Sequence, residues 1–119
     1  MPNVTLEYSG NLAGQFDVRK ALLKLNEALL ATGEFEEPDI KSRAMALDTF
    51  LIGTSPGERA FVHLKVSIFG GRSTEVKREI SRKLLEVLHG LGDMPEFEVQ
   101  LCVEMLAIDR ETYAKENLR

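Results

Sequence analysis

The chain has 119 residues, of which 19 are acidic, 15 are basic and one is a cysteine. The length fits a single domain over residues 1–119, and the acidic excess excludes general nucleic-acid binding, which requires a basic surface. A lone cysteine forms neither an internal disulfide nor a structural zinc site, and no apolar stretch is long enough for a signal peptide or a membrane span, so we expect a cytoplasmic protein.

The first third of the chain predicts a strand followed by a helix. Residues 3–8 alternate between apolar and polar side chains, which is typical of a short strand. Asp17 is a favourable helix N-cap and Gly33 a favourable helix end, so the leucine-rich segment between them is expected to be helical. The expected buried stripe of this helix comprises Val18, Leu22, Leu25 and Leu29, widened by Leu23 and Leu30.

Two strands are expected in the middle of the chain. Residues 40–52 alternate over a long stretch in which neither face is purely polar, so both faces are expected to be covered. The segment from Gly53 to Glu58 predicts a turn. Ala60 to Ile68 then alternates regularly, with one apolar face and one mixed face.

The last third predicts a second helix and a fourth strand. Ser73 is a suitable cap for a helix whose apolar stripe runs from Val76 to Leu91, where glycines end it. Residues 97–107 alternate as a strand, and the polar tail from Asp109 to Arg119 predicts no more than a short helix.

This order, β-α-β followed by β-α-β, predicts an α+β fold. Helices between strands imply crossovers and parallel pairing within each half. We expect a four-stranded mixed sheet with both helices on one face. The open face then requires a cover, and apolar residues such as Met45 and Leu47 favour a homo-oligomer in which other subunits supply it.

Pro2 is the first candidate for chemistry. Removal of Met1 ahead of a small residue leaves the proline nitrogen as a secondary amine at the chain end. A terminal amine has a pKa of about 8, lower when it is buried or close to cations, which suits general acid–base catalysis. Many chains begin Met-Pro for no reason beyond processing, but here a strand begins directly after Pro2 and fixes its position.

Three cationic residues are candidates for binding an anion: Lys41, Arg43 and Arg72. Lys41 and Arg43 lie two apart on a strand, so they point the same way at a separation of about 7 Å, which suits the two ends of a dicarboxylate. Arg72 lies in a Gly-Gly-Arg-Ser turn that opens a helix, where backbone N–H groups and a guanidinium attract carboxylates. Judged singly, each is more often a solvated charge or part of an ordinary turn.

Other reactive side chains give weaker signals. A lone strand histidine such as His63 is usually structural, and His89 does not accompany it at ligand spacing, so no metal and no cofactor is expected. Cys102 is expected to be a small buried residue rather than a nucleophile. Nothing in the spacing distinguishes Asp48 or Glu104, and neither a phosphate loop nor a nucleophile elbow is present.

Several segments of the chain form a combination that is specific although none of its parts is. They are MPNVTLEYSGN at the start, ATGEF and IKSRAMALDTF in the middle, and AFVHLKVSIFGGRS after them. Together they resemble the 5-carboxymethyl-2-hydroxymuconate delta-isomerase family of the tautomerase superfamily. The likeness covers nearly the whole chain and is closest up to Ser73.

This resemblance implies a trimer of β-α-β-β-α-β subunits whose sheets surround a central axis. It implies that Pro2 shuttles a proton between carbons of a small anionic oxo-acid, with Lys41 and Arg72 in the positions of the family's basic pocket residues and Arg43 beside the first. The family has an arginine where this chain has Lys41, and a lysine keeps the charge but loses the two-pronged grip. The setting implied is bacterial breakdown of aromatic compounds such as homoprotocatechuate.

Two other functions stay open on the sequence. One is a tautomerase with a different enol substrate, such as a phenylpyruvate-like enol, because Lys41 leaves the substrate undecided. The other is a ferredoxin-like binding or oligomerisation module without catalysis, because a fold does not fix a function.

Overall fold

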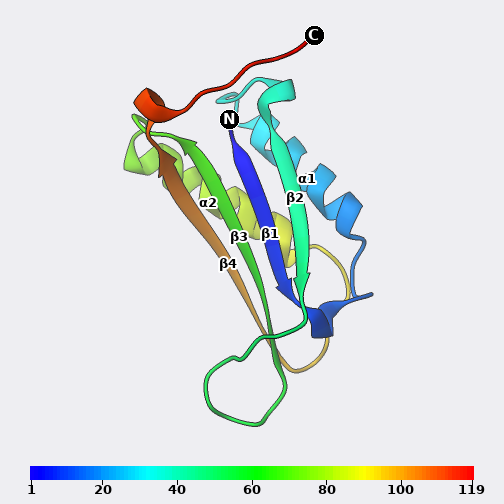
Figure 1. The fold of residues 1–119 in the computed structure, drawn as a ribbon. Coiled ribbons are helices and arrows are strands. Elements are labelled where there is room, and N and C mark those ends of the chain that lie inside the picture. Colours follow the sequence, from blue (N-terminus) through cyan, green and yellow to red (C-terminus); the bar gives the residue numbers. More distant parts are fainter.

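Two helices pack side by side on one face of a four-stranded sheet in the computed structural model, which describes residues 1–119 (Figure 1). Neither helix combines the length and the apolar character that a membrane span requires. The elements in chain order are β1 (Asn3–Ser9), α1 (Val18–Ala31), β2 (Lys41–Leu47), β3 (Arg59–Phe69), α2 (Thr74–His89) and β4 (Glu98–Ile108). Three single-turn 3-10 helices span Gly10–Leu12, Glu37–Asp39 and Arg110–Thr112.

The sheet has the strand order β2-β1-β3-β4. β1 pairs with β2 and β3 pairs with β4 in parallel, while the two central strands β1 and β3 are antiparallel. Each β-α-β half therefore contributes one central and one edge strand. This arrangement confirms the expected α+β fold, with a mixed sheet and both helices on the same face.

The core lies between the helices and the sheet. Every second residue of β1 and β3 points toward the helices and is buried, and so are the inward residues of α1 and α2. Full burial of one aliphatic side chain stabilises a fold by about 1.5–3 kcal/mol. The fully buried larger residues are Val4, Leu6, Leu12, Leu25, Leu29, Val62, Leu64, Val66, Ile68, Ile80, Leu84 and Leu88.

Local polar contacts fix the ends of both helices. The Asp17 carboxylate accepts from the Lys20 backbone N–H at 3.1 Å, and the Ser73 hydroxyl accepts from the Val76 N–H at 3.2 Å. Both predicted N-caps are thus confirmed. α1 ends one residue before expected: Thr32 is its C-cap, and Gly33 follows with a φ of 77°, which lets the chain leave the helix axis.

The strand expected over residues 40–52 is nearly twice as long as the observed one, which spans Lys41–Leu47. β2 ends at Leu47, because its only partner, β1, ends at Ser9, which pairs with Leu47. Residues after Leu47 have no strand to pair with, because the chain after Ser9 turns into a 3-10 helix at Gly10. The ring of Phe50, expected in the strand, instead meets the ring of Phe61 edge-on at 6.1 Å between centroids.

Three predictions of burial are wrong. Leu23 and Leu30 are 59% and 42% exposed, because α1 packs through Leu25 and Leu29 and turns these two side chains to its outer flank. Cys102 is exposed, because it lies on the face of β4 that no helix covers.

That open face of the sheet carries a row of polar side chains. Lys65 Nζ lies 2.9 Å from Glu7 Oε1, and His63 Nε2 lies 2.9 Å from Glu104 Oε1. Apolar side chains are interspersed and remain exposed in the single chain, among them Met45 and Leu106 at 48% and 37%. The face therefore combines ordered ion pairs with exposed apolar side chains.

Candidate active site

Pro2 lies at the start of a central strand. It is buried, and its carbonyl oxygen accepts a hydrogen bond from the Lys41 backbone N–H at 3.1 Å, which extends the β1–β2 ladder by one residue. Because β1 is flanked by β2 on one side and β3 on the other, the sheet holds this residue in place. The proline ring is thus a fixed part of the fold and not a loose tail.

The terminal amine in this chain belongs to Met1 and lies among several charges. Burial lowers the pKa of the Met1 amine below its ordinary value, and the positive charge of Lys41 lowers it further. Lys115 and Arg72 act in the same direction, while Asp39 opposes them. Desolvation and neighbouring cations both disfavour an ammonium ion. The start of the chain is therefore an environment that favours a neutral amine.

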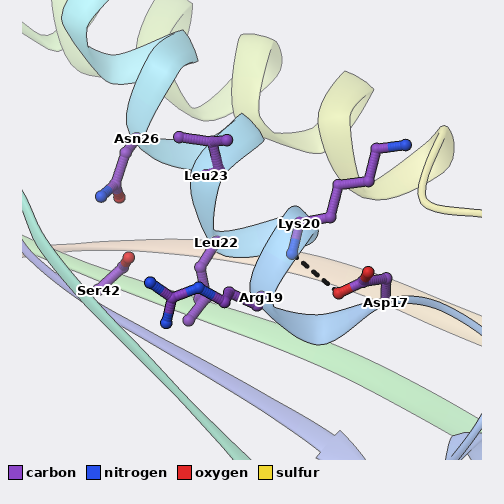
Figure 2. A pocket seen from close by; sticks show the side chains of 7 residues that line it. All are labelled: Asp17, Arg19, Lys20, Leu22, Leu23, Asn26 and Ser42. Atoms are coloured by element: carbon purple, nitrogen blue, oxygen red, sulfur yellow. Dashed lines mark hydrogen bonds between the residues drawn. The ribbon is translucent and has the colours of Figure 1, made fainter.

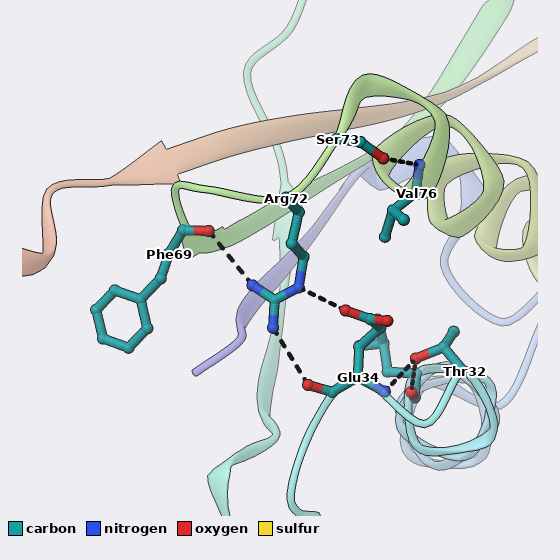
Figure 3. A network of polar contacts seen from close by, with 7 residues as sticks. Thr32, Glu34, Phe69, Arg72, Ser73 and Val76 are labelled. Atoms are coloured by element: carbon teal, nitrogen blue, oxygen red, sulfur yellow. Dashed lines mark hydrogen bonds and ion pairs between the residues drawn. The ribbon is translucent and has the colours of Figure 1, made fainter.

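Arg72 is held by a network of hydrogen bonds (Figure 3). Its Nε donates to Glu34 Oε1 at 2.9 Å, and its two outer nitrogens donate to the carbonyl oxygens of Glu34 and Phe69 at 3.2 and 3.3 Å. The guanidinium also lies over the ring of Phe35, 4.8 Å from the ring centroid. These contacts orient the guanidinium before any ligand arrives.

A tight turn brings Arg72 to this position. Gly71 has a φ of 109°, a backbone conformation that favours glycine, and it directs the chain away from β3. Ser73 then caps α2 through its hydrogen bond to Val76 N–H (Figure 3). The Gly-Gly-Arg-Ser segment predicted from sequence as a helix-opening turn is therefore confirmed, and it points Arg72 at the loop that follows α1.

Asp39 joins two lysines beside the chain end. Its carbonyl oxygen accepts from Lys41 Nζ at 2.7 Å, and its carboxylate lies 2.7 Å from Lys115 Nζ. The hydrogen bond from Lys115 is the main reason that the pKa of the Asp39 carboxyl lies below its ordinary value. Lys41 itself forms no ion pair with a carboxylate, so its charge is available to an anionic ligand.

The structure gathers three of the four predicted site residues at one end of the sheet. Lys41 and Arg72 both act on the amine that precedes Pro2. Arg43 lies on the same face of β2 as Lys41, as expected, but one step farther along the strand, where it is exposed and donates to Asn3 Oδ1 at 3.2 Å.

Sequence reasoning missed two charged residues at this end, Asp39 and Lys115. They lie 76 positions apart, one in a short 3-10 turn and the other in a polar tail without periodicity. No spacing signal could have paired them. His63, the other titratable candidate, is engaged with Glu104 on the open face of the sheet.

The hollows in the surface of the single chain lie elsewhere. The largest, about 540 Å³, lies between α1 and Ser42 of β2 (Figure 2). None of the four hollows is lined by Pro2, Lys41 or Arg72. The candidate site of one chain is thus an open end of the sheet and not an enclosed pocket.

Comparison with known proteins decides the family. Residues 2–119 match the family model described as 5-carboxymethyl-2-hydroxymuconate isomerase (CHMI). The chain belongs to the CHMI family. It is 32% identical over 88 residues to the 5-carboxymethyl-2-hydroxymuconate Delta-isomerase of Escherichia coli, an alignment that covers 74% of this chain and 70% of that protein.

Solved structures agree with this assignment. The crystal structure of a CHMI from Deinococcus radiodurans R1 matches with a TM-score of 0.87 and 34% identity, over 98% of this chain and 89% of that one. A fused 4-OT, solved as a symmetric trimer, matches with a TM-score of 0.72 over 97% and 92% of the two chains, and its 16% identity supports likeness of fold alone. The CHMI family and the tautomerase-superfamily fold, both expected from the resemblance, are confirmed.

Proposed function

We propose that this CHMI-family chain is a cofactor-independent isomerase of 5-carboxymethyl-2-hydroxymuconate, with Pro2 as its general acid/base. The observation that carries the proposal is a buried Pro2 at the start of a central strand, at the same end of the sheet as Lys41 and Arg72. The substrate is suggested by the name of the E. coli relative.

The reaction requires a neutral amine at the chain end. Once Met1 is removed, the Pro2 nitrogen is the terminal amine. Burial and the charge of Lys41 lower the pKa of the Met1 amine, and we expect the same two causes to favour a neutral amine on Pro2. This amine removes a proton from the substrate and returns it to a different atom of the substrate, a carbon. The double bond moves, and neither oxidant nor co-reactant is consumed.

The cations hold the substrate and stabilise its transient charge. Removing the proton places negative charge on the oxygen of the 2-oxo (enol) group, and fixed cations stabilise such charge without reorganising. Arg72, already oriented by Glu34 and Phe69, suits a planar carboxylate. Lys41 supplies charge without a bidentate grip, and Arg43 is a more distant substrate contact.

We propose that the working protein is a homo-trimer in the cytoplasm. The open face of the sheet, with exposed Met45 and Leu106, needs a cover, and the candidate site needs walls that one chain does not provide. Neighbouring subunits supply both. The fused 4-OT of like fold, a symmetric trimer, supports this assembly. A reducing cytoplasm also keeps the exposed Cys102 as a free thiol.

The decisive experiment compares two forms of the chain. One is the processed protein, with Met1 removal verified by mass spectrometry. The other carries a short extension ahead of Met1, which prevents removal of Met1 and so keeps the Pro2 nitrogen in a peptide amide without basicity. We expect isomerisation of 5-carboxymethyl-2-hydroxymuconate, followed by ultraviolet absorbance, only in the processed form. Equal activity of the two forms contradicts the role of Pro2.

Covalent labelling tests the same assignment independently. 3-Bromopyruvate, a halogenated oxo-acid, should alkylate the Pro2 nitrogen of the processed chain, with loss of activity in parallel with labelling in peptide maps. Labelling confined to Cys102, or none, favours a binding module. A processed chain that turns over a phenylpyruvate enol but not the muconate is a tautomerase with another substrate.

A further inference from the structure

The last ten residues, 110–119, form a C-terminal strap across the candidate site. Figure 1 shows this segment leaving the end of β4 and crossing the end of the sheet at which the N-terminus lies. Its first part is fixed on Phe69: the Arg110 guanidinium lies 4.2 Å from the ring centroid, and the Tyr113 ring meets it edge-on at 5.3 Å. Farther along, Lys115 Nζ contacts Asp39 Oδ1 at 2.7 Å.

Both anchors of the strap also hold cations of the site. The carbonyl oxygen of Phe69 accepts from Arg72, and the carbonyl oxygen of Asp39 accepts from Lys41. The strap therefore brings Lys115 to the end of the sheet where Lys41 and Arg72 already lie. The Lys115 charge also acts on the terminal amine in the same direction as those two.

We propose that Lys115 is a substrate-binding residue, the third cation of the site, and that it recognises the third carboxylate of a tricarboxylate substrate. This inference rests on the proposed function. The substrate named there carries two carboxylates on its muconate chain and a third on its carboxymethyl branch. The three cations nearest the chain end, Lys41, Arg72 and Lys115, match that number. Arg43 lies farther along β2.

The contacts of the free chain explain how a substrate gains access to these charges. Arg72 is paired with Glu34, and Lys115 is paired with Asp39, so acids of the chain itself occupy places that suit substrate carboxylates. The Lys115 and Asp39 side chains are 36% and 34% exposed. An ion pair with that much solvent around it is weak. A substrate carboxylate held elsewhere by Lys41 and Arg72 can therefore displace Asp39 from Lys115.

The test compares substrates with three and with two carboxylates. In the full-length processed chain, Lys115→Met should raise KM for 5-carboxymethyl-2-hydroxymuconate about tenfold or more, the effect of losing one charge-assisted hydrogen bond. KM for 2-hydroxymuconate, which lacks the carboxymethyl branch, should change less than twofold, and kcat should change little for both. Lys24→Met, at an exposed lysine of α1, is the matched control and should behave as the wild type.

Asp39→Asn separates substrate binding from anchoring of the strap. This variant breaks the same ion pair but leaves the Lys115 charge free, so KM for the tricarboxylate should stay the same or fall. If Asp39→Asn and Lys115→Met instead raise KM alike, and for both substrates, Lys115 only anchors the strap and the proposal is overturned.

A binding measurement distinguishes failure of this inference from failure of the proposed function. If the wild type isomerises neither muconate, the proposed function fails, and titration calorimetry with tricarballylate and glutarate takes the place of the kinetics. Selective weakening of tricarballylate binding by Lys115→Met supports the third-cation role even then. Equal affinity of the wild type and Lys115→Met for tricarballylate overturns it.

Discussion

The helix-covered face of the sheet and the end of the sheet around Pro2 are ordered by different interactions. Under the helices, aliphatic side chains such as Leu6, Leu64 and Leu84 are buried and packed without a charged partner. Around Pro2, Arg72 and Lys115 are paired with acids and partly exposed, and their order comes from hydrogen bonds.

This difference separates the source of stability from the source of chemistry. Burial of apolar surface sets the free energy of unfolding and fixes β1. The charges at the start of β1 contribute little to that energy, but together with burial they lower the pKa of the terminal amine. Substitutions in the two regions should therefore affect different measurements.

The largest effect is expected in the core, on stability. Leu64→Ala removes a fully buried side chain of β3 and should lower the free energy of unfolding by about 3 kcal/mol, because a cavity remains. Lys24, an exposed lysine of α1, provides the matched control, and Lys24→Ala should change denaturation midpoints little. A comparable loss in both variants would mean that burial under the helices is not the main source of stability.

The next effect is expected on catalysis at Pro2. Pro2→Ala leaves a terminal amine after Met1 removal but loses the ring that fixes the nitrogen, so kcat should fall roughly 100-fold, as misplaced reacting groups do. The melting temperature should stay close to that of the wild type. A drop in melting temperature as large as that of Leu64→Ala would show that Pro2 is mainly a structural residue.

Arg72→Lys probes the geometry of the cationic end. It retains the charge but loses the planar fork that contacts Glu34 and Phe69, so KM should rise about tenfold with a smaller change in kcat. Glu34→Gln is the comparison, since it removes the competing carboxylate and should leave KM unchanged or lower. An Arg72→Lys enzyme with wild-type KM would mean that the network orients the turn and not the substrate.

The smallest effect is a shift in pH dependence. The positive charge of Lys41 disfavours protonation of the terminal amine and lowers its pKa, so Lys41→Met should raise the pKa and move the acidic limb of kcat/KM to higher pH. Arg43→Met, on the same face of β2, should leave the limb almost in place. Equal shifts in both variants would place Arg43 at the site together with Lys41.

The parts of the fold that the sequence predicted well are those set by local interactions. The caps Asp17 and Ser73 bond to N–H groups three residues away, and the alternation of β3 reports its buried face directly. The end of β2 was missed, because it depends on where β1 stops pairing. The prediction that Leu23 is buried was wrong. Neighbouring apolar positions on a helix differ only in the angle at which they face the sheet, and the sequence does not specify that angle.

In the candidate site, too, some features could be predicted from the sequence and others depend on contacts between distant parts of the chain. Pro2, Lys41 and Arg72 were predicted from a proline directly ahead of a strand and from cations at the starts of a strand and a helix, and the family resemblance favoured the same three residues. The pairs that surround them, Arg72 with Glu34 and Lys115 with Asp39, join residues 38 and 76 positions apart, and only the folded chain reveals them.

The burial of Met1 has a consequence for the order of events during synthesis. Met1 is 8% exposed, and its sulfur accepts a hydrogen bond from the Asn3 side chain at 3.3 Å, so the finished fold shields the residue whose removal the proposed function requires. β1 leaves the ribosome first but is enclosed only when β3, about 60 residues later, pairs with it. If Pro2 is to become the terminal residue, excision on the nascent chain is therefore favoured over excision from the folded chain.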